Sequence, residues 1–143
     1  MEGRSYIHLY MNMKQLGKRK NTVDKVPFAY DKAPASLREL ITETVKICVA
    51  DYIARMDKGD AVLTGEQIDD MAEIGKIAFG IVYGEKKPDA CEAVETAING
   101  YEDGMFRVFR GTEELAELDR EEKFDDGDEI TFIRLTMLAG RMW

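Results

Sequence analysis

Alternating apolar and polar positions open the chain and predict a β-hairpin. Residues 5–15 place small or aliphatic side chains on one face and aromatic or polar ones on the other, which is the two-residue period of a strand. The first set is Ile7, Leu9, Met11 and Met13, and the second is Tyr6, His8, Tyr10 and Asn12. A polar stretch, LGKRKNTVDK, then leads to VPFAY, whose Pro27 suits an edge strand because proline has no N–H to donate. We expect these two strands to pair.

A helical period follows the hairpin. Ser36 and Glu39 have the spacing of a capping box, in which each side chain bonds a backbone N–H of the first turn. Apolar residues then recur every three or four positions, as on one face of a helix. They are Leu37, Leu40, Ile41, Val45, Cys48, Val49, Tyr52, Ile53 and Met56. Gly59 lies just beyond the expected end of this long helix.

Residues 57–103 predict two further helices. Thr64 and Gln67 form a second capping box, and KIAFGIVYG, which follows, is apolar on nearly all sides. Periodicity alone does not separate a buried helix end from a strand there, and we favour the helix. Pro88 can begin the next helix, which Gly100 and Gly104 help to end.

The last third of the chain predicts short strands and turns. MFRVFR (105–110) has the pattern of a strand, and GTEE that of a turn. LAELD fits either a short extended piece or a single helical turn. DDGD (125–128) is typical of a tight turn, and it leads into an expected final strand from Ile130 to Met137.

The order of these elements carries a family resemblance. FRGTEELAELDREEKFDDGDEITFIRLTMLAG resembles the C-terminal half of the ubiquitin-like sulfur-carrier proteins, such as the small subunit of molybdopterin synthase, and APASLRELI is similar to the start of their helix. The resemblance covers roughly residues 5–56 and 104–140 and leaves out the insert at 57–103. It implies one α/β (α+β) domain over residues 1–143, with a β-grasp mixed sheet of about four or five strands over one long helix and a two-helix insertion.

The C-terminus departs from that family. Its members end in Gly-Gly, because a bare extended tail can thread into an adenylating enzyme, whereas this chain reads AGRMW. Carriage of sulfur, or conjugation, would therefore require trimming to Gly140. The other interpretation is that Met142 and Trp143 fold back as an apolar plug or contact a partner.

The same layout predicts a sheet with two apolar faces. If the first and last strands are central neighbours, one face packs on the helix that begins at Ser36. That face holds Ile7, Leu9, Met11, Phe106, Val108, Ile130 and Phe132, and the opposite face holds Tyr6, His8, Tyr10, Met105, Arg107, Phe109, Ile133 and Leu135. A monomer rarely exposes so large an apolar patch.

Two explanations of the second face stay open. The inserted helices could cover it and build a three-layer domain. Alternatively, it docks a protein partner or a second copy of the chain, and the residue types are those of interface hot spots. The candidate protein-binding residues are Tyr6, Tyr10, Arg107, Phe109, Ile133 and Leu135.

Composition fits a soluble globular domain that acts in the cytoplasm. The chain is 45% hydrophobic and 34% charged, and its 28 acidic and 20 basic residues give a net charge of −8, which opposes binding to nucleic acid or to an anionic membrane. No apolar stretch reaches the roughly 18–20 residues of a membrane span, and the N-terminus does not have the pattern of a secretion signal. Cys48 and Cys91 lack CxxC spacing, which indicates two free, partly buried thiols in a reducing compartment.

Candidate chemistry is sparse. His8 is the one histidine and lies in a strand, so we expect a ring packed on the sheet rather than a base or a metal ligand. DDGDE lacks the ligand spacing of a calcium loop, and there is no glycine-rich phosphate loop. The basic group Lys14, Lys18, Arg19 and Lys20 fits a solvated hairpin tip.

We therefore expect no catalytic residue, metal or cofactor. The favoured function is a non-enzymatic, cytoplasmic, ubiquitin-like protein-interaction module that can self-associate. The alternative is a carrier or conjugatable protein activated by trimming to Gly140.

Overall fold

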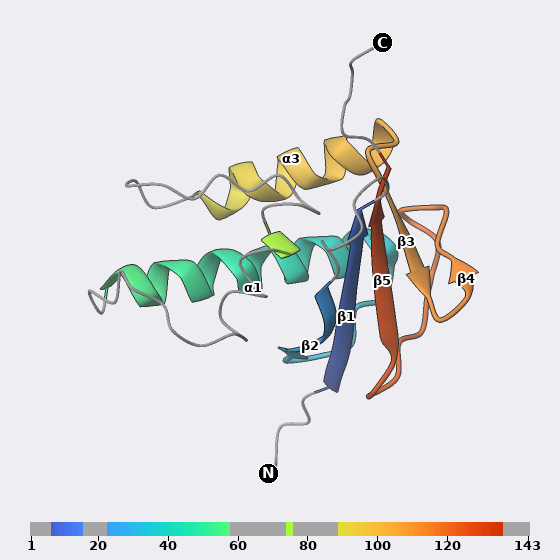
Figure 1. The fold of residues 1–143 in the computed structure, drawn as a ribbon, viewed down its shortest axis with the longest axis horizontal. Helices are drawn as coiled ribbons and strands as arrows, with labels where there is room; N and C mark the ends of the chain where they lie inside the picture. Colours follow the sequence, from blue (N-terminus) through green and yellow to red (C-terminus); the bar gives the residue numbers. More distant parts are fainter. Residues whose placement is uncertain (1–6, 16–22, 58–73, 76–88, 136–143) are drawn as a thin grey trace.

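The computed structural model describes residues 7–15, 23–57, 74–75 and 89–135 (Figure 1). These residues form an α+β fold with a five-stranded sheet and two helices. In chain order the elements are β1 (Ile7–Gln15), β2 (Val23–Tyr30), α1 (Leu37–Asp57), α3 (Ala90–Glu102), β3 (Phe106–Arg110), β4 (Glu113–Glu114) and β5 (Glu129–Arg134). Ile74 and Gly75 are also helical, while the rest of the second predicted helix lies outside the described residues.

The strand order in the sheet is β2-β1-β5-β3-β4 (Figure 1). β1 pairs antiparallel with β2 and parallel with β5, and β3 pairs antiparallel with both β5 and β4. Met11 lies opposite Ile130 and Met13 opposite Phe132. The expectation that the first and last strands are central neighbours is thus confirmed, as are the hairpin and the edge position of Pro27 in β2.

The core lies between α1 and one face of the sheet. Leu9, Met11 and Met13 of β1 are completely buried, and so are Ile130 and Phe132 of β5. From β3, Phe106 and Val108 join the same cluster. The predicted core face is therefore confirmed, with Ile7 packed against its border.

The start of α1 explains why the helix begins where it does. The Ser36 hydroxyl accepts a hydrogen bond from the Glu39 N–H at 3.2 Å, while the Glu39 carboxylate accepts one from the Ala35 N–H at 2.9 Å. These bonds satisfy amide groups that have no partner inside the helix. The predicted N-terminus is confirmed, with the carboxylate reaching one residue further back than in a standard capping box.

The ends of α3 are set by Asp89 and Gly104. The Asp89 carboxylate accepts hydrogen bonds from the N–H groups of Cys91 and Glu92, at 2.9 and 3.4 Å. At the other end, Gly104 has φ +78°, and the Gly104 and Met105 N–H groups bond back to Tyr101 and Gly100. This Schellman arrangement needs the left-handed conformation that glycine adopts freely. The third predicted helix is confirmed, and it begins at Ala90 with Asp89 as its cap.

The predicted GTEE turn is partly wrong, because Glu113 and Glu114 form the short strand β4. Residues 115–117 of LAELD lie in neither a strand nor a helix, and a turn begins at Leu118. Leu115, Leu118 and Phe124 are buried, so this irregular stretch closes one end of the core.

A buried polar contact joins β2 to α1. The Thr44 hydroxyl donates to the Leu40 carbonyl at 2.6 Å, so the Tyr30 hydroxyl, also 2.6 Å away, is the donor to Thr44. Burial raises the pKa of Tyr30 well above its ordinary value. This phenol therefore stays neutral and needs its acceptor.

Removing that acceptor tests the contact. Thr44→Val leaves the Tyr30 hydroxyl buried without its partner, and we expect it to lower the free energy of unfolding by about 1–3 kcal/mol. The double variant Tyr30→Phe/Thr44→Val removes both polar groups and should be more stable than Thr44→Val alone. Urea unfolding of the two variants measures this. A double variant less stable than Thr44→Val would contradict the contact.

The buried thiol of Cys48 makes the stability depend on pH. Burial raises its pKa from 9.0 to about 12, so the folded chain keeps a proton that the unfolded chain loses in this range. The contribution of this thiol to the free energy of unfolding is fully present below about pH 9, and it is lost as the pH rises toward 12. We expect the fall in the free energy of unfolding between about pH 7 and pH 10.5 to be roughly 1–2 kcal/mol smaller in Cys48→Ala than in the wild type.

Urea unfolding in reducing buffer at both pH values provides the measurement. Cys91→Ala is the control because Cys91 is exposed, which corrects the expectation that both thiols are partly buried. An equal fall in Cys48→Ala and the wild type would show that this thiol does not produce the pH dependence.

Candidate functional site

The sheet turns its second face away from α1, and we call this surface the outer face. Paired strand residues point to the same side, so the register places Tyr10 beside Glu129, Phe109 beside Thr131, and Arg107 beside Ile133. Three adjacent strands, β1, β5 and β3, therefore contribute to one surface. The strand residues of the outer face are His8, Tyr10, Asn12, Lys14, Lys25, Pro27, Ala29, Arg107, Phe109, Glu114, Glu129, Thr131 and Ile133.

Most of the candidate binding residues meet on this face. Tyr10, Phe109 and Ile133 are half-buried, whereas the Arg107 side chain is 56% exposed. Leu135 directly follows β5 and is half-buried; its N–H donates to the Met105 carbonyl. Two candidates, Tyr6 and Gly140, lie outside the described residues.

The structure corrects the predicted position of Met105 on the outer face. It precedes β3, so the alternation of that strand does not extend to it. Its side chain lies against the helix α3 at Gly100 and packs against the core cluster. Met105 therefore contributes to the seam between α3 and β3.

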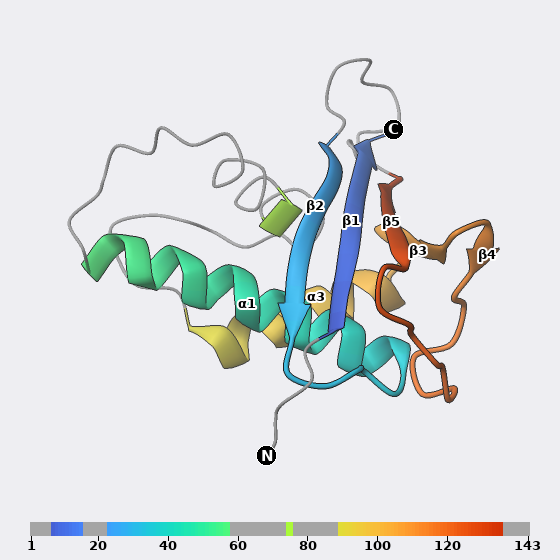
Figure 2. The ribbon, with the colours of Figure 1, turned by 90° about the horizontal axis from the view of Figure 1, so that it is seen from below.

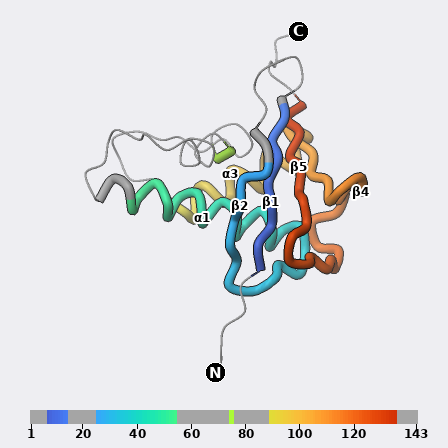
Figure 3. Tube along the Cα trace, turned by 60° about the horizontal axis from the view of Figure 1, so that its bottom comes forward, coloured from blue at the N-terminus to red at the C-terminus, as the bar shows by residue number. Residues whose placement is uncertain are grey.

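α3 lies on the same side of the sheet as α1. Tyr101 of α3 contacts Phe106 edge to face, with ring centroids 5.8 Å apart, and Phe106 belongs to the core face. Figure 2 shows both helices behind β1 and β2, and Figure 3 gives the same arrangement from another angle. The helix α3 thus does not cover the outer face; the rest of the insert lies outside the described residues except Ile74 and Gly75.

Charged side chains surround the apolar groups of the outer face. The nitrogen-to-oxygen distance is 3.7 Å between Arg107 and Glu114 and 3.9 Å between Lys25 and Glu129. Lys14 is exposed at the end of β1. Exposed pairs of this kind contribute at most about 1 kcal/mol each, so they remain available to exchange partners.

Asn12 fixes the middle of the outer face, and the sequence alone did not reveal this role. Its side chain is buried, accepts from the Lys25 N–H at 2.8 Å and donates to Glu129 at 3.1 Å and to Thr131 at 3.4 Å. The β1–β2 register shifts between Met11 and Met13, and Lys25 has φ +54°. Asn12 therefore supplies the acceptor that the displaced Lys25 amide needs, and it links three strands.

His8 has a partner that the sequence did not indicate. Its Nδ1 lies 3.4 Å from the Asp126 carboxylate, which also accepts the His8 backbone N–H at 2.7 Å. Asp126 belongs to the DDGD turn, where Gly127 has φ +93° and the Asp125 N–H donates to Asp128 at 2.9 Å. The predicted turn is confirmed, and His8 attaches it to β1.

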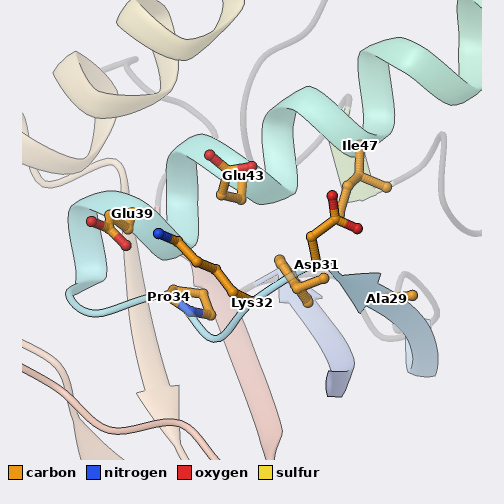
Figure 4. A pocket seen from close by; sticks show the side chains of 8 residues that line it. Ala29, Asp31, Lys32, Pro34, Glu39, Glu43 and Ile47 are labelled. Carbon is orange, nitrogen blue, oxygen red and sulfur yellow. The ribbon is translucent and has the colours of Figure 1, made fainter. Parts of the chain in front are cut away.

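Two pockets flank the sheet. One lies beside β2 and α1, has a volume of about 450 Å³, and is lined by Ala29, Tyr30, Asp31, Lys32, Pro34, Glu39, Glu43 and Ile47 (Figure 4); we call it the β2 groove. The other, of about 540 Å³, is crossed by the ion pair of Arg38 and Asp119, 2.7 Å apart. A hydrogen bond from Arg38 lowers the pKa of Asp119 and raises that of Arg38, so this pair stays charged.

Among the described residues there is no group of three His, Cys, Asp or Glu side chains that could hold a metal ion. No helix in the described part of the chain is long and apolar enough to cross a membrane. Neither a protein-family model, nor a curated protein, nor a solved structure matches this chain.

Neighbouring residues of β5 test which face is the interior. Phe132→Ala removes a completely buried ring, and we expect it to lower the free energy of unfolding by about 3–5 kcal/mol. Ile133→Ala acts on the half-buried outer face and should cost about 1 kcal/mol. Urea unfolding measures both. Equal losses would mean that the outer face is covered within the monomer.

Proposed function

We propose that this chain is a β-grasp, ubiquitin-like protein and that it acts as a non-enzymatic protein-interaction module through the outer face. Support for the fold comes from the strand order β2-β1-β5-β3-β4, with a parallel central pair and one long helix between β2 and β3. This is the layout that the sequence resemblance implies. α3 is the described part of the insertion.

One observation carries the functional proposal. Tyr10, Phe109 and Ile133, one from each of three adjacent strands, are half-buried on the outer face among polar and charged side chains, and the described helices lie on the other side of the sheet. Tyr10, Arg107 and Phe109 are residue types that dominate binding energy at protein interfaces. Asn12 holds the strands beneath them in a fixed register. Binding therefore costs little further conformational entropy.

A second copy of the chain is the partner that fits this face. The whole chain carries a net charge of −8, yet the strands of the outer face present Lys14, Lys25 and Arg107 against Glu114 and Glu129. Two copies that meet here avoid most of their mutual repulsion. A twofold axis brings the same patch of both copies together, and a face that carries both charge signs can pair a cation of one copy with a carboxylate of the other.

The available nucleophiles and bases favour contact over catalysis. Cys48 is buried with its pKa raised to about 12, so it carries no thiolate at neutral pH. His8 is engaged by Asp126 at the end of a strand. We place the chain in the cytoplasm, where reducing conditions keep Cys48 and Cys91 as the free thiols that they are.

Charge substitutions on the outer face test the proposal. We expect light scattering to detect a dimer of the wild type and to show that Phe109→Asp or Ile133→Asp weakens it at least about thirtyfold, because each buries a carboxylate in the interface. Both variants should keep the circular dichroism of the wild type. Thr96→Asp, an exposed position of α3, is the control and should dimerise normally.

Two results would contradict the proposal. A strictly monomeric wild type whose Phe109→Asp and Ile133→Asp variants both unfold would mean that the outer face is part of the interior. Dimers that persist unchanged in both variants would place the interface elsewhere on the chain.

A further inference from the structure

The outer edge of β2 exposes backbone groups next to the β2 groove. The His8 carbonyl and the Tyr10 N–H bond to Gly127 and Asp128, so these two residues direct their main chains toward β5. Their partners on β2, Ala29 and Pro27, therefore direct theirs away from β1. Because β2 is the terminal strand of the described sheet, the Ala29 N–H and C=O and the Pro27 C=O point outward.

Only part of this edge can accept another strand. Pro27 has no N–H to donate, and the N–H of Lys25 is already bonded to Asn12. The first half of β2 is thereby closed to further pairing. Ala29, which lines the β2 groove, holds the outward-facing donor that remains between Pro27 and the end of the strand.

The groove itself has a defined chemistry. Figure 4 shows Glu39, Glu43 and Ile47 on α1, across from Ala29 and the turn that follows β2. Ile47 is half-buried and supplies the apolar contact from the helix. Three carboxylates line the space, from Asp31, Glu39 and Glu43, against the single cation of Lys32.

The carboxylates differ in how firmly they are engaged. Glu39 uses one oxygen to accept the Ala35 N–H as part of the cap of α1. Glu43 lies 3.8 Å from Lys46, a pair in which both side chains are about half exposed. Such a pair exchanges readily for another cation, so Glu43 is the carboxylate that a ligand can recruit.

We propose that the β2 groove binds a short extended peptide that presents an apolar and a basic side chain, two residues apart, on one side. Its backbone pairs with Ala29 and extends the sheet by one strand, which is the recognition mode of peptides at open sheet edges. Every second side chain then points toward α1, where an apolar group contacts Ile47. A Lys or Arg two positions along, on the same side of the peptide, meets Glu43 and complements the net negative charge of the groove.

This binding site is separate from the proposed interface. The groove lies on the α1 side of the edge strand, whereas Phe109 and Ile133 lie on the outer face of β3 and β5. One chain could therefore hold a peptide and a protein partner together. Glu43→Lys alters the groove and Phe109→Asp alters the outer face, each without touching the other surface.

The test uses the full chain and a fluorescein-labelled peptide, GTVTKTVTKG, whose Val and Lys residues share one side, followed by fluorescence anisotropy at about 50 mM NaCl. We expect saturable binding that Glu43→Lys weakens about fivefold and Ala29→Pro at least tenfold. Ala29→Pro removes an N–H that faces away from β1, so the ladder with β1 stays intact. Glu95→Lys makes the same charge change on the exposed side of α3 and should bind within about twofold of the wild type.

Several outcomes would overturn the proposal. Equal weakening by Glu43→Lys and Glu95→Lys would mean non-specific charge attraction, and full binding by folded Ala29→Pro would exclude strand addition. Loss of peptide binding in Phe109→Asp, with Glu43→Lys unaffected, would place the peptide on the outer face. If the peptide does not bind and Glu43→Lys abolishes self-association, the groove instead receives a second copy of the chain.

The same variants distinguish failure of the peptide site from failure of the proposed dimer interface. If Phe109→Asp loses the dimer but still binds the peptide, the result supports both the dimer interface and the peptide site. Failure of the dimer in the wild type leaves the peptide assay fully interpretable, because its readout does not depend on the outer face.

Discussion

The position of β1 between β2 and β5 is the constraint on which the rest of the structure depends. Ile7, Leu9 and Met11 direct their main chains to β2, while His8 and Tyr10 direct theirs to β5, so a buried strand has its polar backbone satisfied on both sides. This pairing also fixes the alternation of side chains in every other strand. Because the period is two, a slip of one residue would exchange the core face for the outer face across the whole sheet.

Both proposed binding surfaces follow from that arrangement. The outer face is the side of the sheet opposite the two helices, and its contact groups come from β1, β5 and β3. The β2 groove arises because β2 ends the sheet beside α1, where the chain turns from strand to helix through Asp31 and Pro34. Within the described part of the chain, both helices lie on one side of the five-stranded sheet, which leaves the outer face and the β2 edge uncovered there. The two surfaces differ in chemistry: the face combines apolar groups with mixed charge, whereas the edge is acidic.

The sequence predicted those features that depend on local periodicity. The two-residue period of β1, the capping residues of α1 and the order of the elements were enough to infer the core face and the neighbouring strands. Features that depend on distant contacts were not accessible: Asp126 beside His8 and the bond from Asn12 to Glu129 join residues 118 and 117 positions apart. The β2 groove was not accessible either, because its shape depends on how the turn after β2 packs beside α1. β4 was missed because its two residues, both Glu, carry no apolar pattern. Met105 was misplaced because alternation ends where the strand ends.

The long connection between β1 and β5 also has a kinetic consequence. Asn12 and Thr131, which meet across this pair, are 119 positions apart, so the central ladder forms only after nearly all of the described chain is available. Contacts of such separation slow folding, because a long loop must be ordered before any pairing energy is gained. The hairpin of β1 and β2 can form early, but it is marginal alone and leaves one side of β1 unpaired. A nascent chain would therefore present that open ladder to other chains, and to chaperones, until β5 arrives.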